Sequence, residues 1–421
     1  MGAFRRHFLK LATVSGASVF QTLALAVLGL MTGKILPVDD FGVTRTIMAY
    51  FYFFTIIGEL CLHDGVAAFI ADSDDSGYRK KFIVNGSYLV LGASLLFVLV
   101  FEVLLYSDRV WTGELRSNMM LVFAFLPAAS LGTVYMNVLP ALGQHGKLSF
   151  NYVLNGFIQL AVIGAGAYVW QMDGWTSTRC LTYVLFLLFS GLQIRQYLEV
   201  QRPDLRTMKT LWGFSRIHLI GGIFSLWFIN ADIIVMERLS MNMYDIANYA
   251  IGSMFAKSVM ILPATIGRVY FKDISRSLDS LERFSVLTGK LLLLTVVSCA
   301  FIAVALYFAA PFLIGVLFGE NYRSSVFIMR ILCVGIAFRG VWNILTPIMV
   351  AARHPGFLLA MSLVANFVST ILFYFWIPAF GSVGTAWATN AAYISSSLFG
   401  CIALFTCRKK LVKQSVATVS A

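Results

Sequence analysis

The chain has 421 residues, of which 59% are hydrophobic and only 12% are charged. The apolar residues come in repeated runs of about 20, the length that crosses the hydrocarbon of a bilayer, and the alternating pattern of membrane β-strands is absent. This composition excludes a soluble globular protein and predicts an all-α polytopic membrane protein. The net charge of +12 lies in short loops, so it gives no indication of nucleic-acid binding.

Twelve apolar runs can be placed along the chain, each long enough for one transmembrane helix. They cover residues 8–31, 43–70, 82–106, 118–142, 149–170, 178–198, 213–236, 247–271, 286–310, 325–351, 357–378 and 383–406. The longest basic connection, residues 199–212, contains Pro203 and divides the runs six and six. We therefore predict an N-terminal lobe at residues 1–200, a cytoplasmic linker at 201–212 and a C-terminal lobe at 213–421.

An internal repeat supports this division. Residues 36–45 (LPVDDFGVTR) align with residues 239–248 (LSMNMYDIAN) at an offset of 203, and residues 141–146 (ALGQHG) align more weakly with residues 351–356 (AARHPG) at an offset of 210. Six spans per repeat give both lobes the same orientation, which predicts a pseudo-two-fold axis along the membrane normal. Parallel repeats of this kind build transporters whose substrate site lies between the halves.

The loop charges predict the orientation of the chain. Of the 32 Lys and Arg residues, 20 fall in loops on the side of the termini and 7, Arg179 among them, fall in the opposite loops. Because cytoplasmic loops carry the excess of positive charge, both termini are predicted to be cytoplasmic. The other basic residues lie within spans or at their margins, and they are Arg195, Lys257, Lys290, Arg330 and Arg339.

Lys257 is the most unusual of these basic residues. It lies in the run of residues 247–271, roughly 15 Å of helix rise from the start of that run and close to the expected bilayer midplane. An unpaired ammonium at this depth is expensive, so Lys257 is expected to face a bundle interior or a water-filled cavity.

The repeat mate of that run, residues 43–70, also carries charge. Glu59 and His63 are four residues apart and share a predicted helix face, and Asp64 follows. The offset of 203 maps Glu59 to Leu262, within reach of Lys257, so a Glu59–Lys257 pair across a cavity is the preferred geometry. The alternative is a neutral Glu59 hydrogen-bonded in the core and a Lys257 that extends to the headgroups.

Further charged residues lie at the ends or in the middle of other runs. Asp232, near the outer end of residues 213–236, is a candidate ion ligand or proton acceptor, or else a helix-end carboxylate partly in water or paired with a neighbouring helix. Arg216, His218 and Arg268 lie at the cytoplasmic ends of their apolar runs. They could form a basic mouth that binds phosphate, or they could serve only to set the orientation of the chain in the membrane. Arg339 lies in the middle of its run, so it must pair or face water.

The sequence shows no enzyme motif and no cofactor or metal motif. Its six cysteines have no metal-ligand or CxxC spacing, which predicts neither zinc nor a disulfide. P-loop, HExxH and GxSxG motifs are absent, and the loops are too short for a catalytic domain. Transport would therefore be driven by an ion gradient or by the gradient of the substrate itself.

Several segments match the sequence patterns of a known protein family, in the same order as in that family and along nearly the whole chain. They are residues 36–42 (LPVDDFG) and 58–62 (GELCL) against LLxPxxFGxY…GLxxA; Asn230-Ala231-Asp232, Tyr249-Ala250, residues 266–269 (IGRV) and 274–276 (ISR) against D…Y.IA…aigrv…lSr; residues 317–322 (LFGENY) against LfGexY; and residues 377–386 (IPAFGSVGTA) within IPxfGxxGAAxAT. These segments resemble the polysaccharide-biosynthesis flippases of the multidrug/oligosaccharidyl-lipid/polysaccharide (MOP) exporter superfamily. Cys61 stands where relatives have glycine, and Lys272 where many have proline.

The resemblance implies a V-shaped, MATE-like pair of six-helix lobes around a central cavity lined by spans 1, 2, 7 and 8. It implies alternating access that carries an undecaprenyl-diphosphate-linked oligosaccharide, for O-antigen, capsule or exopolysaccharide, to the periplasmic leaflet of a bacterial inner membrane. The polyprenyl tail would stay in membrane lipid. We expect a single chain as the transport unit, no cofactor, and a glycan polymerase and a chain-length regulator as partners.

The charged candidates receive roles in this function. The residues expected to bind the diphosphate are Lys257, Arg268, Arg216 and Arg339. The residues expected to act as counter-charges, or to carry a proton or coupling ion, are Glu59, Asp232, His63 and Asp64.

Two other functions stay open. One is a cation-coupled multidrug exporter of the same superfamily, whose often cationic substrates favour an acidic cavity and disfavour Lys257. The other, less favoured, is a membrane-embedded glycan polymerase or ligase, which would be expected to have a large periplasmic loop.

Overall fold

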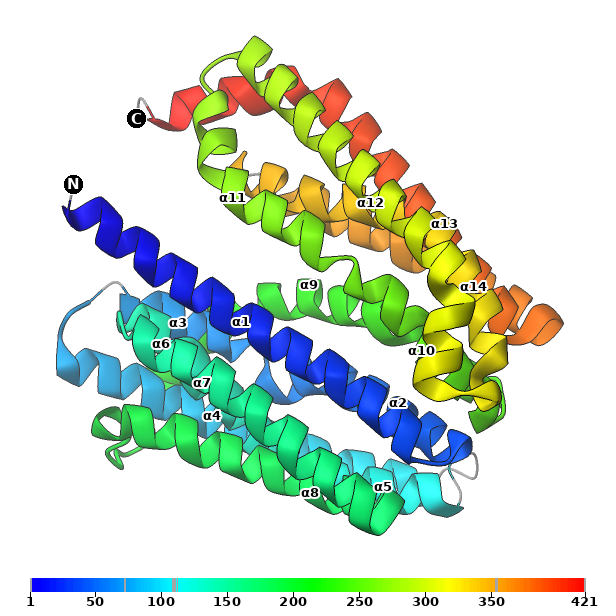
Figure 1. Cartoon of the computed structure of the whole chain (residues 1–421). Helices are drawn as coiled ribbons and strands as arrows, with labels where there is room; N and C mark the ends of the chain where they lie inside the picture. Colours follow the sequence, from blue (N-terminus) through cyan, green and yellow to red (C-terminus); the bar gives the residue numbers. More distant parts are fainter. Residues whose placement is uncertain (1, 72, 108–110, 112, 353–354, 420–421) are drawn as a thin grey trace. The chain divides into compact units, whose positions relative to one another are not determined.

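The structure is a computed structural model, and it describes residues 2–71, 73–107, 111, 113–352 and 355–419. Side chains are described in this part except at residues 2–13, 15, 217, 268, 272, 355 and 407–419. Helices make up almost all of the described chain, and no strand occurs in it (Figure 1). The predicted all-α class is confirmed.

The chain forms two compact units, residues 1–226 and 227–421. The helices that begin in the first unit are α1 (Gly2–Ile35), α2 (Val38–Glu59), α3 (Leu62–Ala71), α4 (Ser76–Ser107), α5 (Gly113–Ala124), α6 (Leu126–Ala141), α7 (His145–Ile158) with its π-helical continuation η1 (Gln159–Ile163), α8 (Gly164–Ile194), the 3-10 turn η2 (Arg195–Tyr197) and α9 (Leu205–Arg238). The units divide within α9. The predicted lobes joined at residues 201–212 stay a prediction.

The second unit contains the end of α9 and five further helices. These are α10 (Met243–Ser258), α11 (Ile261–Ser277), α12 (Leu281–Phe318), α13 (Arg323–Ala351), which follows the 3-10 turn η3 (Glu320–Tyr322), and α14 (Pro355–Val419). α13 packs against α10, α11, α12 and α14, and α6 takes the same central place among α2, α3, α4 and α8 of the first unit. Each unit therefore has its own buried core around one helix.

Nine helical segments of the described chain are long and apolar enough to cross a membrane, or ten if the bent pair α5 and α6 counts as one span. Two of the nine, 53 and 51 residues long, far exceed the roughly 20 residues that a bilayer requires. Each contains one break in helical geometry, at Gln171 and at Gly381. The chain is a multi-pass membrane protein, and the number of twelve spans stays a prediction.

The two breaks repeat each other. Gly381 follows Gln171 by 210 residues, the offset found in the sequence, and the backbone angles match: φ 52° and ψ −129° at Gln171, φ 58° and ψ −135° at Gly381. A Cβ at Gly174 would overlap the Gly166 backbone, and one at Gly384, again 210 residues later, would overlap the Trp376 backbone. The same tight helical hairpin therefore occurs once in each unit.

The helices that carry Glu59 and Lys257 are both interrupted next to these residues. α2 ends at Glu59, and Leu60 and Cys61 adopt left-handed conformations, with φ of 50° and 51°, before α3 begins. α10 ends at Ser258, and α11 begins three residues later. Pro263 explains the second break, because it has no N–H to bond the carbonyl four residues earlier and its ring clashes with that carbonyl.

The connection between α8 and α9 is held against α4. Lys80 pairs with Glu199, the Tyr88 hydroxyl donates to the Gln201 carbonyl at 2.9 Å, and Lys81 pairs with Asp204 at 2.6 Å. The Asp204 carboxylate also caps α9, since it accepts hydrogen bonds from the Arg206 N–H and the Thr207 hydroxyl. The predicted linker is therefore a fixed connection where it leaves α8, and it is helical from Leu205 onwards.

Asp204→Asn tests the charge in this connection, because asparagine caps a helix about as well as aspartate but cannot pair with Lys81. The hydrogen bonds from Lys81, Thr207 and the Arg206 N–H lower the pKa of Asp204 from 3.8 to about 2. A depressed folded-state pKa gives stability that is present above pH 3.8 and lost as the pH falls towards 2. We expect the variant in detergent to melt at a lower temperature than the wild type at pH 7, with the difference shrinking between pH 4 and pH 2.

Lys81→Gln should reproduce this loss, since it removes the other member of the pair. Equal melting temperatures of wild type and Asp204→Asn at pH 7 would show that the ion pair adds no stability.

Cys61→Gly and Cys61→Ala test the break between α2 and α3. Both substitutions remove the same buried thiol, so the difference in stability between the two variants reports the cost of the backbone conformation. A positive φ costs a residue with a Cβ about 1 kcal/mol, so the glycine variant should be more stable than the alanine variant by about this amount in denaturant unfolding. At Val66, which is buried inside α3, the order should be the reverse because glycine is a poor helix former. The same order at both positions would contradict the left-handed conformation.

Candidate functional site

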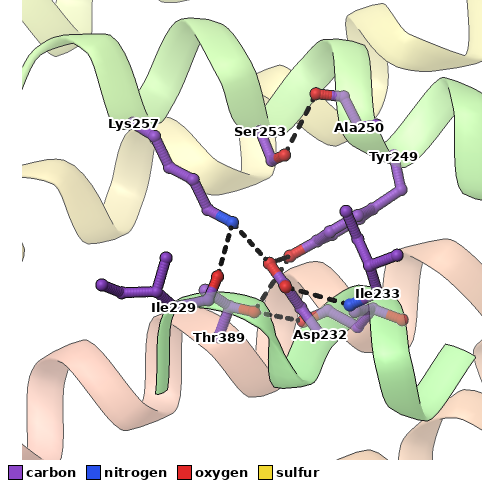
Figure 2. A network of polar contacts seen from close by, with 9 residues as sticks. Ile229, Asp232, Ile233, Tyr249, Ala250, Ser253, Lys257 and Thr389 are labelled. Atoms are coloured by element: carbon purple, nitrogen blue, oxygen red, sulfur yellow. Dashed lines mark hydrogen bonds and ion pairs between the residues drawn. The ribbon is translucent and has the colours of Figure 1, made fainter. Parts of the chain in front are cut away.

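Asp232 lies at the centre of a polar network in the second unit (Figure 2). It sits on the last turns of α9 and is only 4% exposed. Its Oδ2 atom lies 2.8 Å from Lys257 Nζ and accepts a hydrogen bond of 2.9 Å from the Tyr249 hydroxyl, while Oδ1 accepts from the Ile233 N–H at 2.9 Å. Both carboxylate oxygens are therefore satisfied by groups from α9 and α10.

Lys257 reaches this carboxylate from the last turn of α10. Its ammonium also donates to the Ile229 carbonyl at 3.2 Å, so it bridges the side chain and the backbone of α9. Tyr249, Ser253 and Lys257 follow at intervals of four residues, which places them on one face of the helix. The start of α10 is fixed by the Asn242 side chain, which caps it through the Asp245 N–H.

Thr389 joins a third helix to the network. The Tyr249 and Thr389 hydroxyls lie 3.1 Å apart, and the Thr389 hydroxyl donates to the Thr385 carbonyl within α14. Tyr249 and Asp232 are buried, so these hydrogen bonds replace water that neither side chain can reach. The network therefore links α9, α10 and α14 inside the second unit.

A pocket opens beside the network and contains about 290 Å³ of empty space, part of it open to solvent. Three helices line it in stripes: Tyr249, Ser253, Ala256, Lys257 and Met260 from the α10 segment, Leu332, Ile336 and Arg339 from α13, and Thr389 and Tyr393 from α14. The spacing within each stripe is that of one helix face.

Arg339 lies among three aromatic rings at the wall of this pocket. Its guanidinium carbon is 4.8 Å from the ring centre of Phe228, 5.4 Å from that of Trp342 and 5.2 Å from that of Tyr393. Its buried Nη1 atom has no hydrogen-bond partner among the described residues. Cation–π contacts stabilise the charge, but at least one donor is left without a hydrogen-bond partner among the described residues.

The pocket therefore has an excess of positive charge. Lys257 and Arg339 are its two cations, and Asp232, the partner of Lys257, is the carboxylate beside it. Inside a bundle of membrane-spanning helices, the remaining charge favours an anion. Among the described residues, no group of three or more His, Cys, Asp or Glu side chains could hold a metal ion.

The first unit does not repeat this network. Subtracting the repeat offset of 203 from Lys257 gives Phe54, and from Asp232 gives Gly29. The Phe54 ring lies 5.0 Å from Phe97 and 5.2 Å from Phe101 in an aromatic cluster. At these described positions of the first unit, the ion pair of the second unit therefore has no counterpart.

The first unit has instead a charged group at the break between α2 and α3. Glu59, 4% exposed, lies 3.2 Å from His63 Nδ1, and Asp64 lies 3.5 Å from the other ring nitrogen. Glu59 and His63 were expected on one continuous helix face, which is wrong because α2 ends at Glu59. The two left-handed residues between them nevertheless keep the side chains in contact.

The predicted site residues fall into two groups and three single residues. Lys257, Asp232 and Arg339 meet in the second unit, and Glu59, His63 and Asp64 meet in the first. Arg216 and His218 are exposed on α9, and the side chain of Arg268 lies outside the described part.

Two expectations about charged residues need revision. Lys257 has Asp232 as its partner, whereas the sequence favoured Glu59. For Asp232 itself this agrees with the alternative of a carboxylate paired with a neighbouring helix, and the side chain is buried. Arg179, assigned to a loop, is buried in α8, where it donates to Gln159 at 2.8 Å and stacks on Trp175.

Tyr249 and Thr389 are the functional candidates that the sequence analysis missed. Both were within reach of it: Tyr249 lies eight residues before Lys257 on the same helix face, and Thr389 occupies the last position of the IPxfGxxGAAxAT pattern. Their positions on the helix face and in the sequence pattern could have identified them, although neither side chain is charged.

Comparison with known proteins identifies the fold. No protein-family model and no curated protein matches the sequence. Among solved structures, the lipid II flippase MurJ in its inward closed conformation is similar with a TM-score of 0.73 and 14% identity, over 96% of this chain and 90% of that one. An inward-facing MATE-family multidrug resistance transporter of the MOP superfamily has a TM-score of 0.72 and 11% identity, over 93% and 96% of the two chains.

A mutant of the Vibrio cholerae MATE transporter VcmN is also similar, with a TM-score of 0.66 and 14% identity over 96% of this chain and 98% of that one. At these identities the similarity concerns the fold. These structural neighbours are transporters or a flippase, and the chain shares their fold.

Proposed function

We propose that the protein is a flippase that moves undecaprenyl-diphosphate-linked oligosaccharide repeat units from the cytoplasmic to the periplasmic leaflet by alternating access, driven by an ion gradient. The repeat unit would belong to O-antigen, capsule or exopolysaccharide. The single observation that carries this proposal is the cationic pocket of the second unit, in which Lys257 and Arg339 outnumber Asp232.

The chemistry of the substrate matches this pocket. A diphosphate loses its hydration when it leaves water, and charge-assisted hydrogen bonds from ammonium and guanidinium groups replace it. Such cations inside a membrane protein are expensive unless they face a polar cavity or pair, and so they are a functional hypothesis by default. MurJ, which shares the fold, is a lipid II flippase, so the fold supports transport of a lipid-linked substrate.

The charged residues take separate roles in this proposal. Lys257 and Arg339 bind the diphosphate, and Arg216 of the first unit and Arg268 of the second are further basic residues proposed for the same substrate. Asp232 is the counter-charge of Lys257.

Glu59, His63 and Asp64 form a second titratable group that carries protons or a coupling ion. The protein would lie in a bacterial inner membrane with both termini in the cytoplasm. It would act as a single chain beside a glycan polymerase and a chain-length regulator.

A cation-coupled multidrug exporter is the second candidate, because MATE transporters share the fold and two carboxylates, Glu59 and Asp232, are buried. Each of these carboxylates already has a cationic or titratable partner at 3.2 Å or closer. A cationic drug would have to displace Lys257 from Asp232 and would then face Arg339, so the pocket favours an anion.

Lys257→Ala is the direct test of the flippase. Removing the ammonium leaves the buried Asp232 carboxylate without its counter-charge, at a cost of about 3–5 kcal/mol unless it takes up a proton, and removes one of two cations from the pocket. We expect Lys257→Ala to reduce transport of a fluorescent lipid-linked oligosaccharide in proteoliposomes at least tenfold, and Lys257→Arg to retain part of it because the charge remains.

Lys290→Ala is the matched control, since Lys290 is exposed on α12 of the same unit, and it should transport normally. If Lys257→Ala transports the oligosaccharide at the wild-type rate with equal amounts of reconstituted protein, the proposed role of Lys257 in binding the diphosphate is wrong. Transport of a cationic dye in place of the glycolipid would favour the exporter.

A further inference from the structure

We infer that the pocket of the second unit is an oxyanion site with one fixed and one exchangeable cation: Arg339 holds the anion, Lys257 moves to it from Asp232, and Asp232 takes up a proton. This inference rests on the proposed function for the identity of the transported anion. It goes beyond that function because it couples substrate binding to one proton through a named residue.

Arg339 is the fixed cation. Three aromatic rings hold its guanidinium with centre distances between 4.8 and 5.4 Å, and they restrict the plane in which its N–H groups point. The buried Nη1 atom has no partner among the described residues, although it lies in a residue that lines the pocket. A buried unpaired donor is unfavourable, so an oxyanion that accepts from it gains a bond without displacing a protein partner.

Lys257 is the exchangeable cation. Its side chain is 36% exposed, whereas that of Asp232 is 5% exposed. Figure 2 shows its stem extending from the end of α10, while Asp232 is held by both the Tyr249 hydroxyl and the Ile233 N–H. The ion pair can therefore separate by movement of the flexible lysine stem, and the carboxylate stays in place.

Asp232 is left without a counter-charge when Lys257 moves. Tyr249 from α10 contacts it directly, Thr389 from α14 contacts Tyr249, and Tyr393 from α14 and Arg339 from α13 line the pocket beside the network. The tyrosine and threonine hydroxyls are neutral, and Arg339 is engaged by the anion. A buried carboxylate in such surroundings is neutralised by a proton rather than kept charged.

The net charge of the occupied site reaches zero only when this proton is bound. The empty site holds two cations and one carboxylate, a sum of +1. A doubly charged oxyanion would change the sum to −1, and the proton taken from water by an Asp232 oxygen brings it to zero. The lysine stays protonated throughout, and no other covalent bond forms or breaks. Each anion that binds would therefore bring one proton into the protein.

Sulfate is a suitable probe because it stays doubly ionised between pH 5 and pH 8 and contributes no proton of its own. Purified full-length protein in detergent is titrated with sodium sulfate by calorimetry, in two buffers with different ionisation enthalpies and with sodium chloride at matched ionic strength as the reference. We expect uptake of about one proton per sulfate bound. The affinity of the wild type should fall as the pH rises, because binding takes up a proton.

Three variants separate the roles of the residues. Asp232→Asn replaces the acid by a neutral amide of the same shape, so it should bind sulfate at least as tightly as the wild type and without proton uptake. Arg339→Gln should weaken binding at least tenfold, with Arg339→Lys intermediate. Arg330→Gln is the matched control, because Arg330 lies on the same helix but contacts Tyr307 outside the pocket, and it should match the wild type.

Several results would overturn the inference. They are proton uptake by Asp232→Asn equal to that of the wild type, unchanged affinity in Arg339→Gln, pH-independent binding by the wild type, or no sulfate binding at all. The pH series uses the wild type alone, so it tests proton-linked binding even when a variant fails to fold.

The inference and the proposed function fail in different ways. Loss of oligosaccharide transport in Lys257→Ala together with proton-free sulfate binding would leave the flippase standing and refute the exchange. Proton-linked sulfate binding by a wild-type protein that does not transport the oligosaccharide would leave the oxyanion site standing and refute the flippase.

Discussion

The constraint on which the second unit depends is the placement of an ammonium inside a membrane-spanning bundle. Lys257 is tolerated there because Asp232 lies 2.8 Å away and the Ile229 carbonyl accepts a second hydrogen bond. The carboxylate in turn requires Tyr249 and the Ile233 N–H. One unusual lysine therefore fixes the chemistry of neighbouring positions on α9, α10 and α14, since each buried polar group needs a partner.

The two units share features of their backbone but differ in the side chains at positions related by the repeat offset. The helical hairpins recur at an offset of 210 residues with nearly the same backbone angles, while the position of Lys257 is taken by Phe54 in the first unit. Aromatic packing and charged pairing are two ways to fill the same location in a repeated fold. The fold therefore does not determine where the charges lie, and function has to be argued from the side chains.

The sequence predicted the fold class well and the site in part, for a physical reason. Runs of apolar residues report helices directly, because only a helix satisfies its own backbone in lipid. Lys257, Asp232 and Arg339 were identified because a charge in such a run is rare. Their pairing could not be predicted, because the offset between repeats says which helices correspond and not which side chains meet. The breaks at Cys61 and Gln171 were also hidden, since left-handed backbone at a residue other than glycine leaves no clear sequence signal.

The course of α9 has a mechanical consequence. This helix begins in the first unit, where Asp204 ties its start to α4, and ends in the second, where it carries Asp232. The chain passes from one unit to the other within a helix and not through a slack loop. A displacement of one unit against the other would therefore have to bend or rotate this helix, whose last turns carry the carboxylate that pairs with Lys257.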